Sequence, residues 1–300
     1  MARGAATAMS PSLPHIDGVS HEEITVRGLR RHVATAGPAD GRSVFLHHGW
    51  PQHFWMWRHL MPALAAEGFR VVAPDSRGFG WTEHPPDEDF SHQAFVDDAV
   101  ALCDALGLES IRFVGHDWGC WFGFMLCLER PDLVERAVLA SAPHPWPPEP
   151  AADLETLKRL SSLAYQVAIG APGVPRDAKL ALFGTVARVA HGERFSDEEL
   201  EAYMAPLRLA TQVRASTLLY RNTVLHELAP VAQGKYRERR LEVPTLYLMG
   251  DGDPLYDEPQ FHALREHGDH VRTEVIAGAG HFLPEEAPDA LRDRVLAHLS

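Results

Sequence analysis

An acidic side chain stands where a nucleophile would be expected, in a tight turn at residues 115–119, Gly-His-Asp-Trp-Gly. The turn follows the apolar run Ile111–Val114, which predicts a buried strand, and precedes Cys120–Arg130, which predicts a helix. Glycines on both sides of Asp117 permit a turn too tight for Cβ atoms at those positions. A carboxylate presented in this way attacks a saturated carbon and forms an alkyl-enzyme ester. The substrate should therefore carry an electrophilic sp3 carbon, as in an epoxide or an alkyl halide.

The strand, turn and helix around Asp117 resemble the nucleophile elbow of the α/β-hydrolase fold. An ordinary turn with a surface aspartate is the alternative, and the partner residues must decide between the two. In this fold an acid and then a histidine follow the nucleophile along the chain. A later apolar strand ends in Asp251 and Asp253, and the next strand is followed by His281 in a Gly-rich turn. We expect His281 to be the base and favour Asp253 over Asp251 as the acid that orients it.

A second loop, at residues 47–51 (His-His-Gly-Trp-Pro), follows the apolar run Ser43–Leu46. In the α/β-hydrolase fold the loop after the third strand supplies one N–H group of the oxyanion hole, and the residue after the nucleophile supplies another. We therefore expect the backbone N–H groups of Trp50 and Trp118 to stabilise a developing negative charge. A simple turn is the alternative for this loop, but its distance upstream of the elbow argues against it.

From about Glu22 to its end, the chain resembles the α/β-hydrolase-fold epoxide hydrolases. His48–Pro51 is similar to the family's His-Gly-x-Pro loop, and Asp75–Thr82 to its Asp-x-Arg-Gly-x-Gly-x-Ser/Thr segment. Two tyrosines carry the more specific part of the likeness. Tyr165 lies in a Tyr-Gln pair followed by Pro-Gly-Val, and Tyr220 lies in Tyr-Arg-Asn, as the two cap tyrosines of the family do. The loop motifs are shared by several related enzymes, whereas this pair of tyrosines is not.

The resemblance implies that Tyr165 and Tyr220 donate hydrogen bonds to the epoxide oxygen. Ring opening generates an alkoxide, which is a poor leaving group unless it is protonated as it forms. A phenol with a reference pKa of ~10 stays protonated at neutral pH and can supply that proton. An alkyl halide needs no such donor, because halide leaves as a stable anion. Packing within the cap is the alternative for each tyrosine. It weighs most for a third tyrosine of the same region, Tyr203.

The expected reaction converts a small apolar epoxide to a vicinal diol. Asp117 opens the ring, and His281, oriented by Asp253, activates the water that hydrolyses the resulting ester. No metal or organic cofactor is implied. We expect apolar side chains to form the walls of the substrate site: Trp50, Trp118, Trp146 and Phe282.

A haloalkane dehalogenase is the main alternative, since that family shares the Asp nucleophile and the Asp-Trp pair. It typically has Asn where this chain has Trp50, and fluoroacetate-type dehalogenases have Arg where it has Trp118. A non-catalytic binding protein of the same fold is a third possibility. The presence of the acid pair, the histidine and both tyrosines argues against it.

The composition is that of a cytoplasmic enzyme. A formal net charge of −13 without any concentration of Lys or Arg argues against nucleic-acid binding. The three cysteines, Cys103, Cys120 and Cys127, have no metal-ligand spacing and indicate thiols in a reducing compartment. No stretch approaches the ~20 apolar residues of a membrane span. We expect a monomer or homodimer that binds neither nucleic acid nor membrane.

The elements that must position these residues form one α/β domain with an insertion. Strand and helix patterns alternate from about Glu23 to Pro143, which predicts a mostly parallel sheet with helices on both faces. Prolines then crowd residues 143–150 and mark a boundary, and alternation resumes at Val243. We therefore expect a core from residues 1–143 and 227–300, with 1–14 disordered, and a helical cap from residues 144–226. Within the cap the pattern indicates helices such as Leu154–Val167, Asp197–Pro206 and Ala215–His226.

Overall fold

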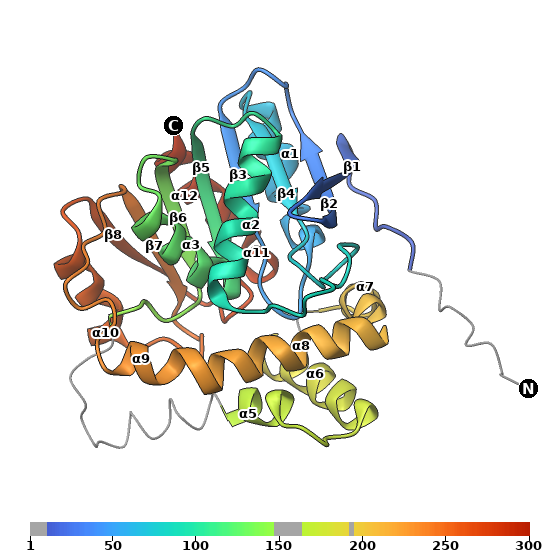
Figure 1. Cartoon of the computed structure of the whole chain (residues 1–300). Coiled ribbons are helices and arrows are strands. Elements are labelled where there is room, and N and C mark those ends of the chain that lie inside the picture. Colours follow the sequence, from blue (N-terminus) through green and yellow to red (C-terminus); the bar gives the residue numbers. More distant parts are fainter. Residues whose placement is uncertain (1–10, 147–163, 192–194) are drawn as a thin grey trace, which may run out of the picture.

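The computed structural model describes residues 11–146, 164–191 and 195–300. Its centre is an eight-stranded sheet in the order β1-β2-β4-β3-β5-β6-β7-β8, in which the strands from β4 onwards pair in parallel (Figure 1). This confirms the predicted α/β-hydrolase fold with a mostly parallel sheet. The strands are β1 (Val19–Val26), β2 (Leu29–Ala36), β3 (Ser43–His47), β4 (Arg70–Pro74), β5 (Ile111–His116), β6 (Val134–Ala140), β7 (Thr245–Gly250) and β8 (Val271–Ile276).

The first two strands differ from the expected parallel alternation, because they form an antiparallel hairpin that adds to the edge of the sheet at β4. Val26 pairs with Leu29, so Arg27 and Gly28 alone make the turn. Both turn residues have positive φ values, 51° and 72°. Two-residue turns of this kind match the twist of antiparallel strands.

Helices cover both faces of the sheet and bury its apolar side chains. On one face lie α2 (His92–Ala105), α3 (Trp118–Glu129) and α10 (Glu258–Ala263), which leads into the 3-10 turn η4 (Leu264–His267). On the other lie η1 (Phe54–Trp57), α1 (Leu60–Ala66), α11 (Leu283–Glu286) and α12 (Pro288–Leu299). The central strands β3, β4, β5 and β7 are nearly fully buried, which explains why their sequences are mostly apolar.

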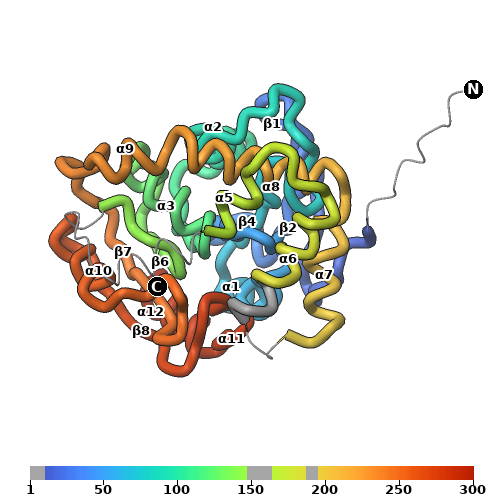
Figure 2. The backbone as a smooth tube through the Cα atoms, turned by 90° about the horizontal axis from the view of Figure 1, so that it is seen from below, coloured from blue at the N-terminus to red at the C-terminus, as the bar shows by residue number. Residues whose placement is uncertain are grey.

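A third group of helices, which we call the cap helices, lies across one end of the sheet (Figures 1 and 2). It comprises α5 (Ala164–Gly170), α6 (Arg176–His191), α7 (Asp197–Leu207), α8 (Ala210–Asn222), the π-helical turn η3 (Thr223–Glu227) and α9 (Leu228–Ala232). Of the expected helix Leu154–Val167, the part before Ala164 lies outside the described residues. The run from α8 through η3 to α9 is continuous and extends past the predicted boundary at residue 226. The division into core and cap remains a prediction.

Candidate active site

The turn that carries Asp117 is strained and closely packed. Asp117 joins β5 to α3 with φ 53° and ψ −120°, a backbone conformation that few non-glycine residues adopt. A Cβ atom at Gly115 would lie 2.3 Å from the carbonyl oxygen of Gly119. A Cβ atom at Gly119 would lie 2.0 Å from the carbonyl oxygen of His47. Both glycines are therefore required sterically, and the turn projects the Asp117 carboxylate beyond the end of β5.

The loop after β3 lies against this carboxylate. The backbone N–H of Trp50 donates to Oδ1 of Asp117 at 2.7 Å. The indole Nε1 of Trp50 donates to the Ser216 hydroxyl on α8 at 3.0 Å, so the same residue also contacts a cap helix. Trp118, the other expected donor, is the first residue of α3. Ser216 had no sequence signal, because its partner is 166 residues away in the chain.

His281 lies between two aspartates. Its Nε2 is 3.5 Å from Oδ2 of Asp117, and its Nδ1 is 3.1 Å from Oδ2 of Asp253. The other oxygen of Asp253 accepts the backbone N–H of Leu255 at 2.9 Å. Asp251 is exposed and accepts the N–H of Gly278 instead, at 2.8 Å. Of the two acids left open by the sequence, only Asp253 contacts the histidine.

The charges of His281 and Asp253 perturb each other. Burial alone lowers the pKa of His281, but the charge of Asp253 and hydrogen bonds to both aspartates outweigh it and raise the pKa to about 10. Burial likewise opposes ionisation of Asp253, and the charge of His281 outweighs it and holds the pKa of Asp253 below its ordinary value. The pair is therefore ionic at neutral pH, and Nδ1 of His281 donates to Asp253.

Two groups that the sequence analysis missed, the buried His116 and the partly buried Glu286, hold the loop of His281. The ring Nε2 of His116 donates to the backbone carbonyl of His281 at 2.7 Å. Burial lowers the pKa of His116 to about 4, with a further contribution from the charge of His281, so the ring is neutral. The carboxylate of Glu286 accepts the N–H groups of Gly280 at 2.7 Å and Phe282 at 2.9 Å. His116 stands in the elbow motif itself, but nothing in its spacing indicated this contact.

The two cap tyrosines face each other from α5 and α8. The ring centroids of Tyr165 and Tyr220 are 5.8 Å apart, and the indole Nε1 of Trp118 donates to the Tyr220 hydroxyl at 3.3 Å. Burial, followed by the charge of Asp117, raises the pKa of Tyr165 to about 12. Burial also raises the pKa of Tyr220 well above its ordinary value. Both phenols are therefore protonated at neutral pH and can act as donors.

Tyr203 lies elsewhere. Its hydroxyl donates to Glu285 and accepts from Arg58 at 3.3 Å, where α7 meets α11 and η1. The structure thus separates Tyr203 from the other two tyrosines and gives it a packing role between the cap helices and the core.

A cavity of about 270 Å³ joins Asp117 to Tyr165. Three of the four expected wall residues, Trp50, Trp146 and Phe282, lie outside its lining. Trp146 is buried in the core, stacked on His267 at a centroid distance of 4.8 Å, because its indole finds a carbonyl partner at Arg239. Phe282 is buried beside the ring of His281. Trp118 does line the cavity, and Trp50 lines a much smaller space that shares only Trp118 with it. The remaining wall is mostly apolar and comes from Trp121, Ala142, Pro143, Leu228, Val231 and Leu255, with His92, His144, Gln166, Thr223, Glu227 and Gln260.

Two classes of site are absent from the part of the chain that the structure describes. No group of three or more His, Cys, Asp or Glu side chains there is arranged to hold a metal ion. Within the same residues, no helix combines the length and the apolar character needed to span a bilayer.

Comparison with known proteins identifies the family of this chain. The alpha/beta hydrolase fold family model matches residues 42–288. The soluble epoxide hydrolase of Corynebacterium sp. (strain C12) is 28% identical over 93% of this chain and 96% of its own length. Epoxide hydrolase 2 of Siraitia grosvenorii is 39% identical, but over only 41% of this chain and 39% of its own length.

A solved structure gives the same result for the fold. The epoxide hydrolase CorEH, without ligand, superposes with a TM-score of 0.79 and 26% identity, covering 94% of this chain and 98% of that one. The similarity includes the cap helices as well as the sheet, since it covers nearly the whole of both chains. The chain belongs to the alpha/beta hydrolase fold family, and within it resembles the soluble epoxide hydrolases.

Proposed function

We propose that the protein is an epoxide hydrolase that forms a covalent ester on Asp117 and releases a vicinal diol. One observation carries the proposal: Asp117 and the protonated phenol of Tyr165 line the same mostly apolar cavity, with Tyr220 packed against Tyr165. A carboxylate on one side and phenol donors on the other are what opening a neutral three-membered ring requires. The names of the relatives similar over nearly the whole chain support the same reaction.

In the first step, an oxygen of Asp117 attacks one ring carbon and the carbon–oxygen bond of the epoxide breaks. The electron pair of that bond goes to the ring oxygen, which takes a proton from Tyr165 or Tyr220. The negative charge on this oxygen exists only as the bond breaks, so donors fixed in advance lower the barrier selectively. Raised pKa values keep both phenols protonated until then.

In the second step, a water activated by His281 attacks the ester carbonyl of Asp117. Ester formation removes the charge of Asp117, which is one of the causes of the raised pKa of His281, so the imidazolium can release a proton that restores the tyrosinate to a phenol, and the neutral ring can then act as a base. As the water adds to the carbonyl carbon, His281 takes one of its protons. The bond between that carbon and the alkyl oxygen then breaks, and the alkyl oxygen takes this proton from His281 and leaves as part of the diol. Asp253 keeps the ring oriented. In the structure the N–H of Trp50 lies 2.7 Å from Oδ1 of Asp117, so it is positioned to stabilise the tetrahedral oxyanion that forms from this group.

The contact of Trp118 favours epoxide over halide chemistry. A dehalogenase would need the indole N–H of Trp118 as a halide ligand, but this N–H donates to the Tyr220 hydroxyl. Trp50 uses its indole N–H on Ser216. Both indole N–H groups are therefore used within the protein, whereas Tyr220 stays protonated because burial raises the pKa of its hydroxyl.

The decisive experiment traps the ester. His281→Gln should still be alkylated by styrene oxide or a terminal alkyl epoxide but should not hydrolyse the ester. Intact-protein mass spectrometry should then show one adduct per chain that adds the full mass of the epoxide, since ring opening expels no atom. An alkyl bromide would instead add its mass less HBr.

The adduct should map to Asp117 by peptide sequencing and should be absent from a His281→Gln, Asp117→Asn double variant. Loss of turnover in His281→Gln without any adduct would refute the two-step scheme. An adduct only with the bromoalkane would reassign the protein as a dehalogenase.

We also propose a cytoplasmic location, which the three buried, unpaired cysteines support.

A further inference from the structure

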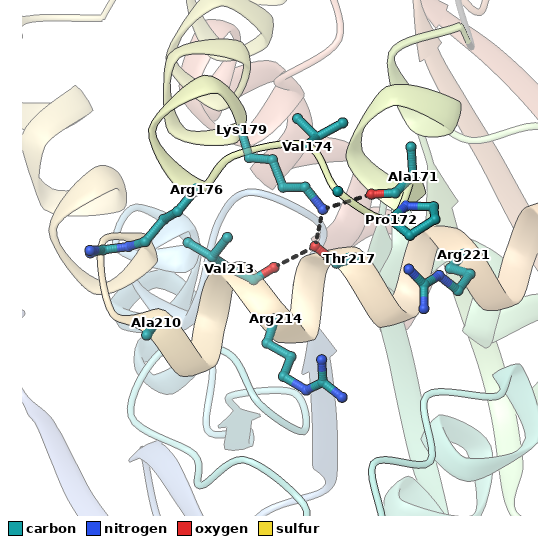
Figure 3. A pocket seen from close by; sticks show the side chains of 11 residues that line it. Ala171, Pro172, Val174, Arg176, Lys179, Ala210, Val213, Arg214, Thr217 and Arg221 are labelled. Atoms are coloured by element: carbon teal, nitrogen blue, oxygen red, sulfur yellow. Dashed lines mark hydrogen bonds between the residues drawn. The ribbon is translucent and has the colours of Figure 1, made fainter.

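A buried lysine, Lys179, contacts the two helices that carry the cap tyrosines, α5 and α8, and does not line the cavity of Asp117. Lys179 projects from α6 beside a separate cavity of about 320 Å³ that is lined by the segment after α5, by α6 and by α8 (Figure 3). Its side chain is 5% exposed. Its ammonium donates to the backbone carbonyls of Ile169 at 2.8 Å and Ala171 at 3.2 Å and to the Thr217 hydroxyl at 2.7 Å. The three donors of the ammonium are thus matched by three acceptors from two other helical segments.

This charge has no acidic partner among the described residues that line the cavity. Burial lowers the pKa of Lys179, and the nearby charge of Arg221 lowers it further. The acceptors that stabilise it include carbonyls at the carboxyl end of α5, where the helix dipole is negative. A buried cation held by these groups loses much of its stabilisation if α5 moves, so it favours a single position of that helix.

The position of α5 matters because α5 carries Tyr165, one helical turn before Ile169. The carbonyl of Gly170 also accepts from Nε of Arg221 on α8 at 3.1 Å. A Cβ at Gly170 would lie 2.8 Å from the backbone nitrogen of Arg221, so the end of α5 lies directly against α8. Lys179 therefore ties the helix of Tyr165 to the helix of Tyr220.

The second helix, α8, is in turn fixed to the core. Gln212 donates to the carbonyl of Gly80 at 2.6 Å, and the Ser216 hydroxyl accepts from the indole of Trp50 at 3.0 Å. Arg214 pairs with Glu88. Contacts thus lead from the core to α8 and from α8 through Lys179 to α5.

We propose that Lys179 is a positioning residue that sets Tyr165 relative to Tyr220 and to Asp117. The inference rests on the proposed function, in which both phenols act on one epoxide oxygen. A displacement of a reacting group by ~1 Å can reduce a rate by ~10²-fold. The lysine touches neither substrate nor reacting atoms and acts only through the helix that it holds.

The test separates the two chemical steps of the full-length protein. Lys179→Met keeps the length of the side chain and removes the three hydrogen bonds. Single-turnover kinetics with styrene oxide, followed by mass spectrometry of quenched samples, gives the rate constants for ester formation and ester hydrolysis. We expect ester formation to slow about 10- to 100-fold and ester hydrolysis to change less than about threefold, because phenol donors assist only ring opening.

Two controls match this change. Arg176→Met replaces an exposed cation on the same helix and should leave both rate constants unchanged. Thr217→Val removes one acceptor of the ammonium with little change in shape and should slow ester formation, whereas Thr217→Ser retains the hydroxyl and should restore it. A loss of folded protein would lower the amplitude of the reaction and leave its rate constants unchanged, so the readout distinguishes positioning from stability.

Hydrogen–deuterium exchange of the amides of residues 164–171 tests the contact without any substrate. Lys179→Met should increase their exchange at least about tenfold relative to Arg176→Met. Unchanged exchange would overturn the tie between the helices. Faster exchange with an unchanged rate of ester formation would overturn the positioning role. A parental protein that exchanges as expected but forms no adduct with any epoxide would instead reject the proposed function.

Discussion

Replacing the two cap tyrosines by phenylalanine tests the central chemical claim with the least change in packing. Tyr165→Phe and Tyr220→Phe each remove one hydroxyl from two mutually packed rings, of which Tyr220 is buried and Tyr165 partly buried, and leave the aromatic contacts in place. Both rings also pack against Trp50, at centroid distances of 6.2 and 5.2 Å, so the cap helices should keep their position in either variant.

The magnitude follows from what each hydroxyl does. Loss of one donor to a developing oxyanion costs about 3–4 kcal/mol, or roughly 10²–10³ in rate. Each single variant should therefore form the ester about 10²-fold more slowly, and the double variant at least about 10³-fold more slowly. Tyr220→Phe should also cost about 0.5–1.5 kcal/mol of stability, because the partly buried indole N–H of Trp118 loses its acceptor.

The assay is the single-turnover rate of ester formation, with an epoxide and a bromoalkane of the same chain length in parallel. Tyr203→Phe is the matched control, because its hydroxyl contacts Glu285 and Arg58 outside the cavity. It should lower stability without slowing ester formation. Ester formation from the epoxide at near parental rate in the double variant would refute the assignment of these residues. Bromide release that proceeds well and ignores both changes would favour a dehalogenase.

Three further predictions concern the histidine, its acid and the contact between α5 and α8. Asp253→Asn should slow ester hydrolysis by about 10³–10⁴-fold, since the imidazole loses the partner that fixes its orientation, whereas Asp251→Asn should leave the rate within about twofold. The pKa of His281 is raised in the folded state, so the stability that this residue gains from its aspartates should be fully present between about pH 5 and 6.5 and should diminish as pH rises toward about 10. The unfolding free energies of the parental protein and of His281→Gln, measured in urea across this range, should therefore converge at high pH. Convergence at low pH within that range would contradict the direction of the shift. Gly170→Ala should destabilise the protein by about 1–3 kcal/mol, because the new Cβ would meet the backbone of α8. Gly184→Ala in α6 is the control: its Cβ would enter open space, so the substitution should stabilise the protein by up to about 1 kcal/mol.

The sequence was most informative where function depends on short segments with strict steric demands. The elbow around Asp117 needs glycines at two fixed positions, and the parallel strands need continuous apolar runs, so both leave a pattern in the chain. These features were sufficient to predict a mostly parallel sheet, and they led to the predicted site residues around Asp117. Asp253 and Asp251 could not be separated by spacing alone, because both follow the same strand and only their side-chain directions differ.

Contacts between distant segments left no such pattern. Trp146 was expected in the wall of the substrate site, but its indole packs in the core, and sequence cannot tell which way a tryptophan points in a proline-rich turn. Lys179 lies on a helix whose pattern did not single it out, and its three acceptors come from two other segments. Such residues become visible only once the helices are packed.

The two contacts of Trp50 have a consequence for redesign. Its backbone N–H meets the reacting carboxylate, while its indole is held by Ser216 on a cap helix. A library that varies α8 to change which epoxides fit will also disturb the group that stabilises the tetrahedral oxyanion during ester hydrolysis. Variants selected for a new substrate preference should therefore accumulate the covalent intermediate, and screening for product alone would discard those whose selectivity had improved. Holding Ser216 constant while the rest of the helix is varied would keep the two properties independent.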